Sequence, residues 1–303
     1  MRIAVASGKG GTGKTTVAVN LAVLRAESAS DRTLLLDCDV EAPNTHLYLA
    51  PSIEERRSVH QSAPEVDEAG CTGCGLCARA CRFGALIEVR TAPGIPGAPI
   101  MVLPELCHGC GACTLACRNG AIREVAREVG TLLLGRAGRL LYGQGILCVG
   151  EAMATPVVRR LKEYADAAPF VVLDAPPGTA CPMVETVRGA DFCVLVTEPT
   201  PFGLHDLRAA VAVTRALGAP AGVVINRDGI GDERVARWCA GAGLPVLARI
   251  AYDRRVAELC AEGKPLVRVS SEHARLFRGL LDRIVALAPP VPGTAAALPA
   301  RSA

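Results

Sequence analysis

A glycine-rich segment between a predicted strand and a predicted helix constrains the fold of this chain more than any other feature. The apolar run at residues 3–7 predicts a strand, and residues 14–27 predict a helix. Between them lies the pattern Gly-x4-Gly-Lys-Thr, in which loop amides and the helix N-terminus point at anionic oxygens. An incidental glycine-rich turn is the alternative, but it leaves the flanking strand and helix unexplained. Lys14 is expected to reach the β- and γ-phosphates and Thr15 to bind magnesium.

Short runs of β-branched residues or leucine recur along the chain and are mostly separated by amphipathic segments of helix length. This alternation predicts an α/β fold, a Rossmann-like parallel sheet with helices on both faces. The expected strands are residues 3–7, 34–37, 170–174, 192–196, 223–225 and 246–250, and the expected helices are residues 14–27, 156–168, 204–217, 233–240, 254–262 and 272–287.

Composition and charge exclude several classes of protein. The 303 residues are 50% hydrophobic with a formal net charge of +3, which is typical of a globular chain without a basic surface for nucleic acid. The N-terminus has no signal-peptide pattern, and no apolar run approaches the ~20 residues of a membrane span. We therefore expect a cytoplasmic protein whose 14 cysteines are mostly reduced thiols rather than disulfides.

The regular alternation stops between about residues 62 and 124, where a cysteine motif occurs twice. The two copies begin at Cys71 and Cys107, and each has the spacing Cys-x2-Cys-x2-Cys-x3-Cys. A structureless loop of that length would be unusual, so residues 62–124 are predicted to form an inserted α+β ferredoxin-like domain organised by metal. The ATPase domain would then comprise residues 1–61 and 125–288, residues 91–99 would connect the two copies, and residues 289–303 would form a disordered tail.

The cysteine spacing predicts two 4Fe-4S clusters with crossed ligation. Three closely spaced thiolates surround one face of a cluster, while the fourth cysteine of each copy binds the other cluster. Two zinc sites are the alternative, although zinc motifs ordinarily combine two Cys-x2-Cys pairs for one ion. The first cluster would take Cys71, Cys74, Cys77 and Cys117, and the second would take Cys107, Cys110, Cys113 and Cys81.

The phosphate loop carries a second lysine, Lys9, and residues 9–16 resemble the deviant Walker A loop of the MinD, Mrp and nitrogenase-iron-protein superfamily. In that superfamily the corresponding lysine reaches across an ATP-sandwich dimer to the partner's nucleotide. Further matches are Asp37 and Asp39 in Leu-Asp-Cys-Asp-Val, Asp174 in Leu-Asp-Ala-Pro-Pro-Gly, Asn226 in Val-Ile-Asn-Arg, and Asp253 after the last expected strand. The resemblance covers about 240 residues.

The resemblance implies a role for each matching residue. Asp39 would position or activate the attacking water, Asp174 would support magnesium through water, and Gly178 would sense the γ-phosphate. Asn226 would read adenine. A helix cap at the end of a strand is the alternative role for Asp37 and, less readily, for Asp39. The implied catalytic set is Lys9, Lys14 and Asp39, and the implied nucleotide-binding set is Gly8, Gly10, Gly11, Thr12, Gly13, Lys14, Thr15, Thr16, Asp174, Gly178, Asn226 and Asp253.

Loop and insert together resemble MinD-superfamily ATPases with an inserted ferredoxin domain. The resemblance implies ATP and Mg²⁺ as ligands and slow ATP hydrolysis by a homodimer or a heterodimer with a paralogue. Two departures qualify it: the proline that usually follows the fourth cysteine is replaced by Arg82 and Arg118, and the Cys-x-x-Cys of Mrp-type carriers is missing. We expect the two arginines to lie at the surface.

Two cysteines outside the repeat, Cys148 and Cys181, raise the hypothesis of a third cluster. Their positions resemble those from which the nitrogenase iron protein binds a cluster that bridges its dimer; ordinary packed thiols are the alternative. The apolar stripe of the last expected helix resembles the membrane helix of MinD, but core packing is expected instead, so no stable membrane insertion is predicted.

Three functions are compatible with these features. The first is an ATP-dependent redox protein in which a nucleotide switch is coupled to the clusters and to a redox partner. The second is a carrier or scaffold that passes a cluster to an acceptor protein. The third is a positioning or regulatory ATPase whose clusters sense redox state. Tight ligation by four cysteines per cluster favours retention, and therefore the first function.

Overall fold

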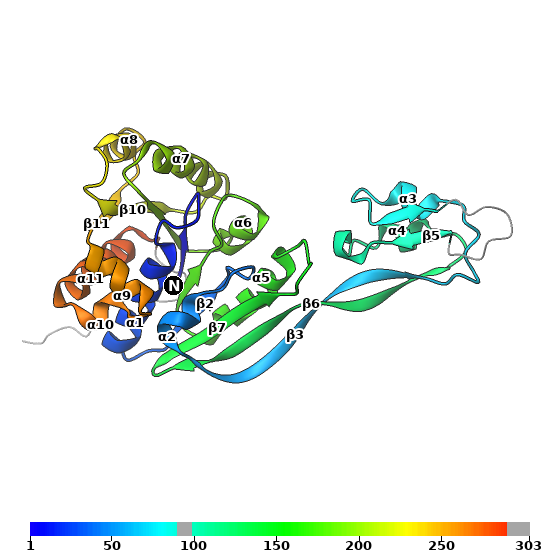
Figure 1. Ribbon diagram of the computed structural model, residues 1–303, viewed down its shortest axis with the longest axis horizontal. Coiled ribbons are helices and arrows are strands. Elements are labelled where there is room, and N and C mark those ends of the chain that lie inside the picture. The colour runs from blue at the N-terminus through cyan, green and yellow to red at the C-terminus, as the bar shows by residue number, and fades with distance from the viewer. Residues whose placement is uncertain (90–98, 290–303) are drawn as a thin grey trace, which may run out of the picture. The chain divides into compact units, whose positions relative to one another are not determined.

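The computed structural model describes residues 1–89 and 99–289, which divide into two compact units (Figure 1). The first unit contains Met1–Glu55, Leu133–Gly145 and the chain from Val158 onward; the second contains Arg56–Leu132 and Ile146–Val157. The expected insert, 62–124, lies inside the second unit, whose boundaries are wider. The expected tail and nearly all of the expected 91–99 connector lie outside the described residues.

The main sheet has nine strands in the order β11-β10-β9-β1-β8-β2-β7-β6-β3. Strand pairs from β11 to β7 run parallel, as the alternation of the sequence predicted. The strands are β1 (Arg2–Ala6), β2 (Thr33–Asp37), β3 (Ser52–Val66), β6 (Ile122–Ala137), β7 (Leu140–Leu147), β8 (Phe170–Asp174), β9 (Phe192–Thr197), β10 (Ala221–Asp228) and β11 (Val246–Ala251).

Two strands of this sheet, β3 and β6, were not predicted. Most residues of β3 are exposed. Its first seven residues, Ser-Ile-Glu-Glu-Arg-Arg-Ser, show no apolar periodicity. Such a strand is stabilised by the backbone hydrogen bonds of the sheet rather than by burial of its side chains. Both β3 and β6 contribute residues to each of the two units.

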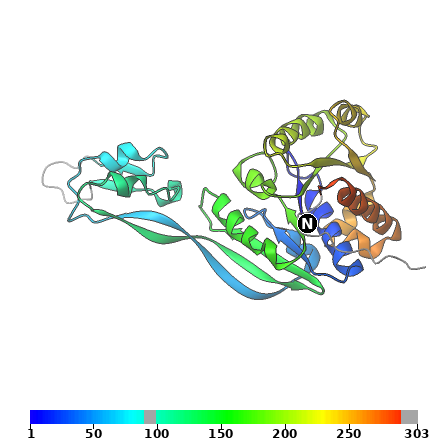
Figure 2. The same cartoon turned by 180° about the vertical axis from the view of Figure 1, so that it is seen from behind.

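Helices α1, α7, α8, α9 and α11 of the first unit overlap the predicted positions, whereas α2, α6 and α10 were not predicted. One group packs around α1 and α11, and another contains α7 and α8; Figures 1 and 2 show the two groups on opposite sides of the strands. The expected helix at 156–168 is divided into α5 and a 3-10 segment, η2. The bounds are α1 (Lys14–Ser28), α2 (Thr45–Leu49), α5 (Thr155–Lys162), η2 (Glu163–Ala167), α6 (Cys181–Val187), α7 (Pro201–Ala216), α8 (Arg234–Gly241), α9 (Arg254–Ala261), α10 (Leu266–Val269) and α11 (Ser271–Leu287).

The core of the first unit is extensive and apolar. Helix α1 is buried over most of its length, and the central strands β1, β2, β8 and β9 are almost entirely buried. The apolar stripe of α11 packs into this core through Phe277, Leu280 and Ile284, which are inaccessible to solvent. Within the described residues, none of the helices is both long enough and apolar enough to cross a bilayer.

The second unit has little regular structure apart from the long strands. The short helices α3 (Leu76–Ala80) and α4 (Ala112–Ala116) contact one another, and β4 (Leu86–Glu88) pairs antiparallel with β5 (Ile100–Val102). A 3-10 segment, η1, covers Pro104–Leu106. The buried cluster of this region is small and consists of Cys77, Ala85, Leu86, Ile100, Cys107, Cys113 and Ile122. So small a core is typical of domains that need a bound metal or cross-links to remain folded.

Candidate nucleotide site and cysteine cavities

The predicted nucleotide-binding residues come together at one edge of the main sheet. Because the parallel strands all end at this edge, the segments that follow β1, β2, β8, β10 and β11 lie near one another. A cavity there is lined by the phosphate loop and by Asp39, Asn226 and Asp253, together with Tyr48 and Tyr252. In the sequence, the phosphate loop and Asp253 are more than 200 positions apart.

Two glycines of the phosphate loop have no room for a side chain. A Cβ on Gly8 would lie 2.2 Å from the backbone oxygen of Asp206, and one on Gly13 would lie 2.3 Å from Asn226 Nδ2. Gly13 also has a φ of 90°, which L side chains rarely adopt. The loop therefore depends on glycine at both positions, and the N-terminal turn of α1 remains open to a phosphate.

Lys14 forms an ion pair with Asp39 in the nucleotide site. Lys14 Nζ lies 3.1 Å from Asp39 Oδ2, and only 8% and 9% of the two side chains are exposed. Burial alone would lower the pKa of Lys14, but the nearby Asp174, Asp39 and Asp37 raise it above its ordinary value. Lys14 is therefore held as a cation beside the cavity, with Asp39 as its partner.

Asp174 is the residue whose environment best fits a hydrated magnesium ion. It is completely buried at the end of β8, and among the residues that the structure describes no hydrogen bond reaches either carboxylate oxygen at ordinary geometry, although the nearby Thr15 hydroxyl lowers the pKa of Asp174. Burial raises its pKa to about 7, while Lys14 opposes that rise. A buried carboxylate without partners is costly unless a cation or water satisfies it. Thr15, also buried here, supplies the hydroxyl that such an ion requires.

Asp37 has the contacts of a structural carboxylate. It accepts hydrogen bonds from the backbone nitrogens of Asn44 (3.1 Å) and Thr45 (3.0 Å), and from Thr45 Oγ1 (2.7 Å). The backbone nitrogen of Asp39 also donates to it, at 3.1 Å. Asp37 therefore fixes the loop that carries Asp39 and caps the start of α2, as the alternative interpretation of this residue proposed.

Lys9 is held within its own chain by a residue that the sequence had not singled out. Lys9 Nζ lies 3.1 Å from Glu198 Oε2, and Arg227 pairs with the other oxygen of the same carboxylate. Glu198 is buried, with 8% of its side chain exposed, whereas 32% of the Lys9 side chain is exposed. The sequence did contain one indication of Glu198: it directly follows the predicted strand that became β9, so it lies at the same edge of the sheet as Asp39 and Asp174.

The remaining predicted residues shape the loop and the far end of the cavity. Asn226 Nδ2 donates to the backbone oxygen of Thr12 at 2.8 Å, and Asp253 caps α9 by accepting from the backbone nitrogen of Arg255 at 2.8 Å. Gly178 has a φ of 86° and donates its N–H to Ser7 at 3.0 Å. Thr16 Oγ1 lies 3.2 Å from the hydroxyl of Tyr48, which also lines the cavity.

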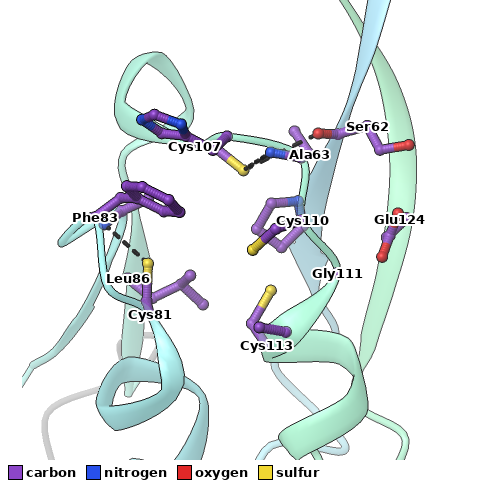
Figure 3. Close-up of a pocket in the computed structure, with 15 residues that line it drawn as sticks. Ser62, Ala63, Cys81, Phe83, Leu86, Cys107, Cys110, Gly111, Cys113 and Glu124 are labelled. Atoms are coloured by element: carbon purple, nitrogen blue, oxygen red, sulfur yellow. Dashed lines mark hydrogen bonds between the residues drawn. The ribbon is translucent and has the colours of Figure 1, made fainter. Parts of the chain in front are cut away.

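In the second unit, the cysteines gather around two cavities of similar size. The larger cavity, with about 360 Å³ of empty space that includes open solvent, is lined by Cys107, Cys110 and Cys113 of the second copy and by Cys81 of the first. Figure 3 shows the sulfurs of these four residues facing the same space. The smaller cavity, with about 340 Å³ of such space, is lined by Cys71, Cys74 and Cys77 together with Cys117. Each cavity thus combines three cysteines of one copy with the last cysteine of the other.

Backbone amides face several of these sulfurs. The N–H of Ala85 donates to Cys81 Sγ at 3.3 Å, and the N–H of Gly109 donates to Cys107 Sγ at 3.4 Å. Burial favours the neutral Cys81 thiol, but hydrogen bonds from backbone amides of residues 83–86 lower its pKa below the ordinary value. For Cys77 and Cys113, burial raises the pKa. Amides that point at sulfur stabilise the thiolates of metal sites.

The cysteines do not converge as ligands of a single ion would. Among residues 1–89 and 99–289, no group of three or more Cys, His, Asp or Glu side chains is close enough to hold one metal ion. A zinc ion needs its sulfurs about 2.3 Å from one centre. The four cysteines at each cavity are the residues that would hold a cluster through four thiolates, as their spacing predicts.

The remaining cysteine predictions have mixed surroundings. Cys181 is exposed at the start of α6 in the first unit, and Cys148 is partly exposed in the second. Burial and the neighbouring Glu128 and Glu151 raise the pKa of Cys148. Arg82 and Arg118 are both exposed, as expected. The third, bridging cluster stays a prediction.

Comparison with known proteins identifies the family. Residues 3–266 match the family described as the CobQ/CobB/MinD/ParA nucleotide binding domain. The chain is 30% identical over 273 residues to the uncharacterized protein MJ0579 of Methanocaldococcus jannaschii, covering 88% of this chain and 92% of that one. It is 26% identical over 284 residues to the cytosolic Fe-S cluster assembly factor NUBP2 homolog of Culex quinquefasciatus, covering 88% of each.

Among solved structures, the crystal structure of the cell division ATPase MinD from Pyrococcus furiosus is similar, with a TM-score of 0.57 and 22% sequence identity. That similarity covers 95% of this chain and 99% of the other, and it shows a shared fold. Together with the phosphate loop and the residues gathered beside it, these matches show that the chain belongs to the CobQ/CobB/MinD/ParA family of nucleotide-binding domains.

Proposed function

We propose that this protein is an ATP-hydrolysing switch that carries two 4Fe-4S clusters and couples nucleotide state to their redox chemistry. One observation carries the proposal: a chain with a nucleotide site of this family also gathers four cysteines at each of two cavities, with one ligand exchanged between the copies. Exchange of the fourth cysteine is the arrangement expected for two adjacent cubane clusters.

In the nucleotide reaction, water attacks the γ-phosphorus of ATP, the bond between that phosphorus and the β–γ bridging oxygen breaks, and ADP, inorganic phosphate and a proton are released. Lys14 would neutralise charge on the β- and γ-phosphates, and Asp39, freed from Lys14, would orient the attacking water. Thr15 would bind magnesium directly, and Asp174 would bind it through water. When bound, the ion neutralises charge on the phosphates. So small a catalytic set supports slow hydrolysis, as befits a switch.

Lys9 would act on the nucleotide of a second subunit. To do so it must leave Glu198, its present partner within the same chain. Closure of a dimer around two nucleotides would supply phosphate oxygens in place of that carboxylate. The dimer, formed with an identical chain or with a paralogue, would therefore depend on ATP.

Cluster transfer is the second candidate function. It is favoured by the name of a relative of 26% identity, a cytosolic Fe-S cluster assembly factor. A carrier would release a cluster to an acceptor protein, whereas a redox protein would pass electrons from a bound cluster to a partner. A positioning or regulatory ATPase that senses redox state is the third candidate.

An anaerobic redox titration with and without ATP would separate these functions. For the redox protein we expect a nucleotide-dependent change in midpoint potential or in electron flow to a partner, abolished in Lys14→Ala. Faster cluster transfer to an apo-acceptor with ATP would favour the carrier instead. If ATP altered only the assembly of the protein, and oxidation modulated that assembly, the regulatory function would be favoured.

The third cluster has its own test, because Cys148 and Cys181 lie outside both cavities. Two retained clusters account for about eight irons per chain. If a further cluster bridged a dimer, the variants Cys148→Ser and Cys181→Ser would each lower the iron content per dimer by about four. Unchanged iron in both variants would exclude the bridging cluster.

A further inference from the structure

A different pair of side chains forms a contact at the lining of each cysteine cavity, and we call each such pair a clasp. At the larger cavity, the ring of Phe83 stacks on that of His108, with centroids 3.6 Å apart and planes within 9°. At the smaller cavity, Asn119 Nδ2 donates to Thr72 Oγ1 at 2.9 Å. Each pair joins the segment of the exchanged fourth cysteine to the segment of the other three.

These pairs occupy equivalent positions of the repeat. His108 and Thr72 each follow the first cysteine of their copy, while Phe83 and Asn119 each lie two residues after the last cysteine. The two copies of the repeat therefore place a clasp at the same positions, but one clasp is aromatic and the other is polar. All four residues are exposed to solvent, so each clasp is in direct competition with water.

The two clasps should resist water differently. Stacked rings bury apolar area that water cannot replace favourably. A hydrogen bond between an exposed hydroxyl and an exposed amide is exchanged for bonds to water at little net cost. The aromatic clasp should therefore stay closed for a larger fraction of the time than the polar clasp.

Two further observations point the same way. Cys107 is buried, whereas Cys71, its counterpart in the first copy, is partly exposed. The larger cavity is also walled by residues 62–64 of β3, and Gln61 Nε2 donates to the backbone oxygen of Cys107 at 2.8 Å. No residue of β3 lines the smaller cavity.

From these differences we propose that the two cluster sites are unequal in retention: the site of Cys107, Cys110, Cys113 and Cys81 is the retained one, and the site of Cys71, Cys74, Cys77 and Cys117 is the exchangeable one. This inference rests on the proposed presence of clusters at both cavities. It means that one chain can keep one cluster for electron transfer while the other cluster is open to loss or transfer.

The test is the rate of iron release from the anaerobically reconstituted full chain in excess ferrous chelator. We expect two phases of about four irons each, at least about fivefold apart in rate, the ratio that a difference of about 1 kcal/mol between clasps produces. The double variant Phe83→Asn/His108→Thr places the polar clasp on both cavities and should accelerate the slow phase. The reciprocal variant Thr72→His/Asn119→Phe should slow the fast phase.

The variant His108→Phe is the matched control, because it keeps two stacked rings and removes the imidazole. It should preserve the slow phase, and nucleotide binding should remain unchanged in every variant. Release of about eight irons in one phase by the unmodified chain would overturn this inference alone. So would two phases that neither clasp exchange alters. A chain that binds no iron would overturn the cluster function itself.

Discussion

The nucleotide site and the cysteine cavities are built by opposite means. The nucleotide site stands on a large apolar core, so its loop, its lysine and its carboxylates are held before any ligand binds. The cysteine cavities have beside them only a small apolar cluster, of which three members are themselves cysteines expected to bind iron. The nucleotide site should therefore form when the apolar core folds, whereas the cysteine region should fold only when its cysteines bind metal.

Removal of iron gives the largest expected contrast between the two regions. Without clusters, the segments around α3 and α4 should lose most of their protection against amide hydrogen exchange, because their small core cannot offset the chain entropy. The helices and strands of the first unit should keep their protection, and ATP should still bind. Equal loss of protection in both regions, measured by hydrogen-exchange mass spectrometry on holo and apo protein, would contradict the comparison.

The two lysines of the phosphate loop should separate binding from assembly. Lys14→Ala should weaken ATP binding by about 100-fold or more, because it removes a buried charge that contacts the phosphates and leaves Asp39 unpaired. Lys9→Ala should change binding less than about threefold while it lowers hydrolysis about tenfold or more and reduces dimerisation. Calorimetric titration and sedimentation would measure the two effects. Comparable losses of binding in both variants would remove Lys9 from the partner's site.

Asp174 should make magnesium-nucleotide binding depend on pH. Its pKa is raised from 3.8 to about 7 by burial, so the ligand-free protein favours the protonated carboxyl below pH 7. Magnesium favours the charged form and should bind about tenfold more tightly at pH 8 than at pH 6. The folding stability of the ligand-free protein has the opposite pH dependence, because the stability that this group contributes falls as the pH rises from 3.8 to about 7. Asp174→Asn should remove the pH dependence of binding; its persistence would assign it to another group.

Glu198 should give the smallest of these effects. Glu198→Gln removes the carboxylate that holds Lys9 within its own chain, so ATP-dependent dimerisation should strengthen about two- to fivefold. Glu163→Gln is the matched control, because it removes an exposed carboxylate that pairs with Arg160 at the surface. Unchanged or weaker dimerisation in Glu198→Gln would show that Glu198 does not restrain Lys9.

The sequence predicted the nucleotide region far better than its surroundings. The strand ends that carry Asp39, Asp174 and Asn226 follow apolar runs whose burial dominates their folding, and those strands were predicted correctly. The strands β3 and β6 were missed because exposed charged residues such as Glu54 and Arg123 carry no periodic signal. The 3-10 segment after α5 was missed as well, since its residues are compatible with a continued helix.

The sequence by itself determined the motifs of this protein: a phosphate loop that contains Gly8 and Gly13, carboxylates after apolar strand-like runs, and two copies of a four-cysteine motif. These are local patterns, and residue type and spacing are sufficient to define them. Only the tertiary structure decided that Glu198 holds Lys9 and that Phe83 meets His108 while Asn119 meets Thr72. Such contacts join residues far apart in the chain, and their distances depend on how the intervening segments pack rather than on any one segment's sequence.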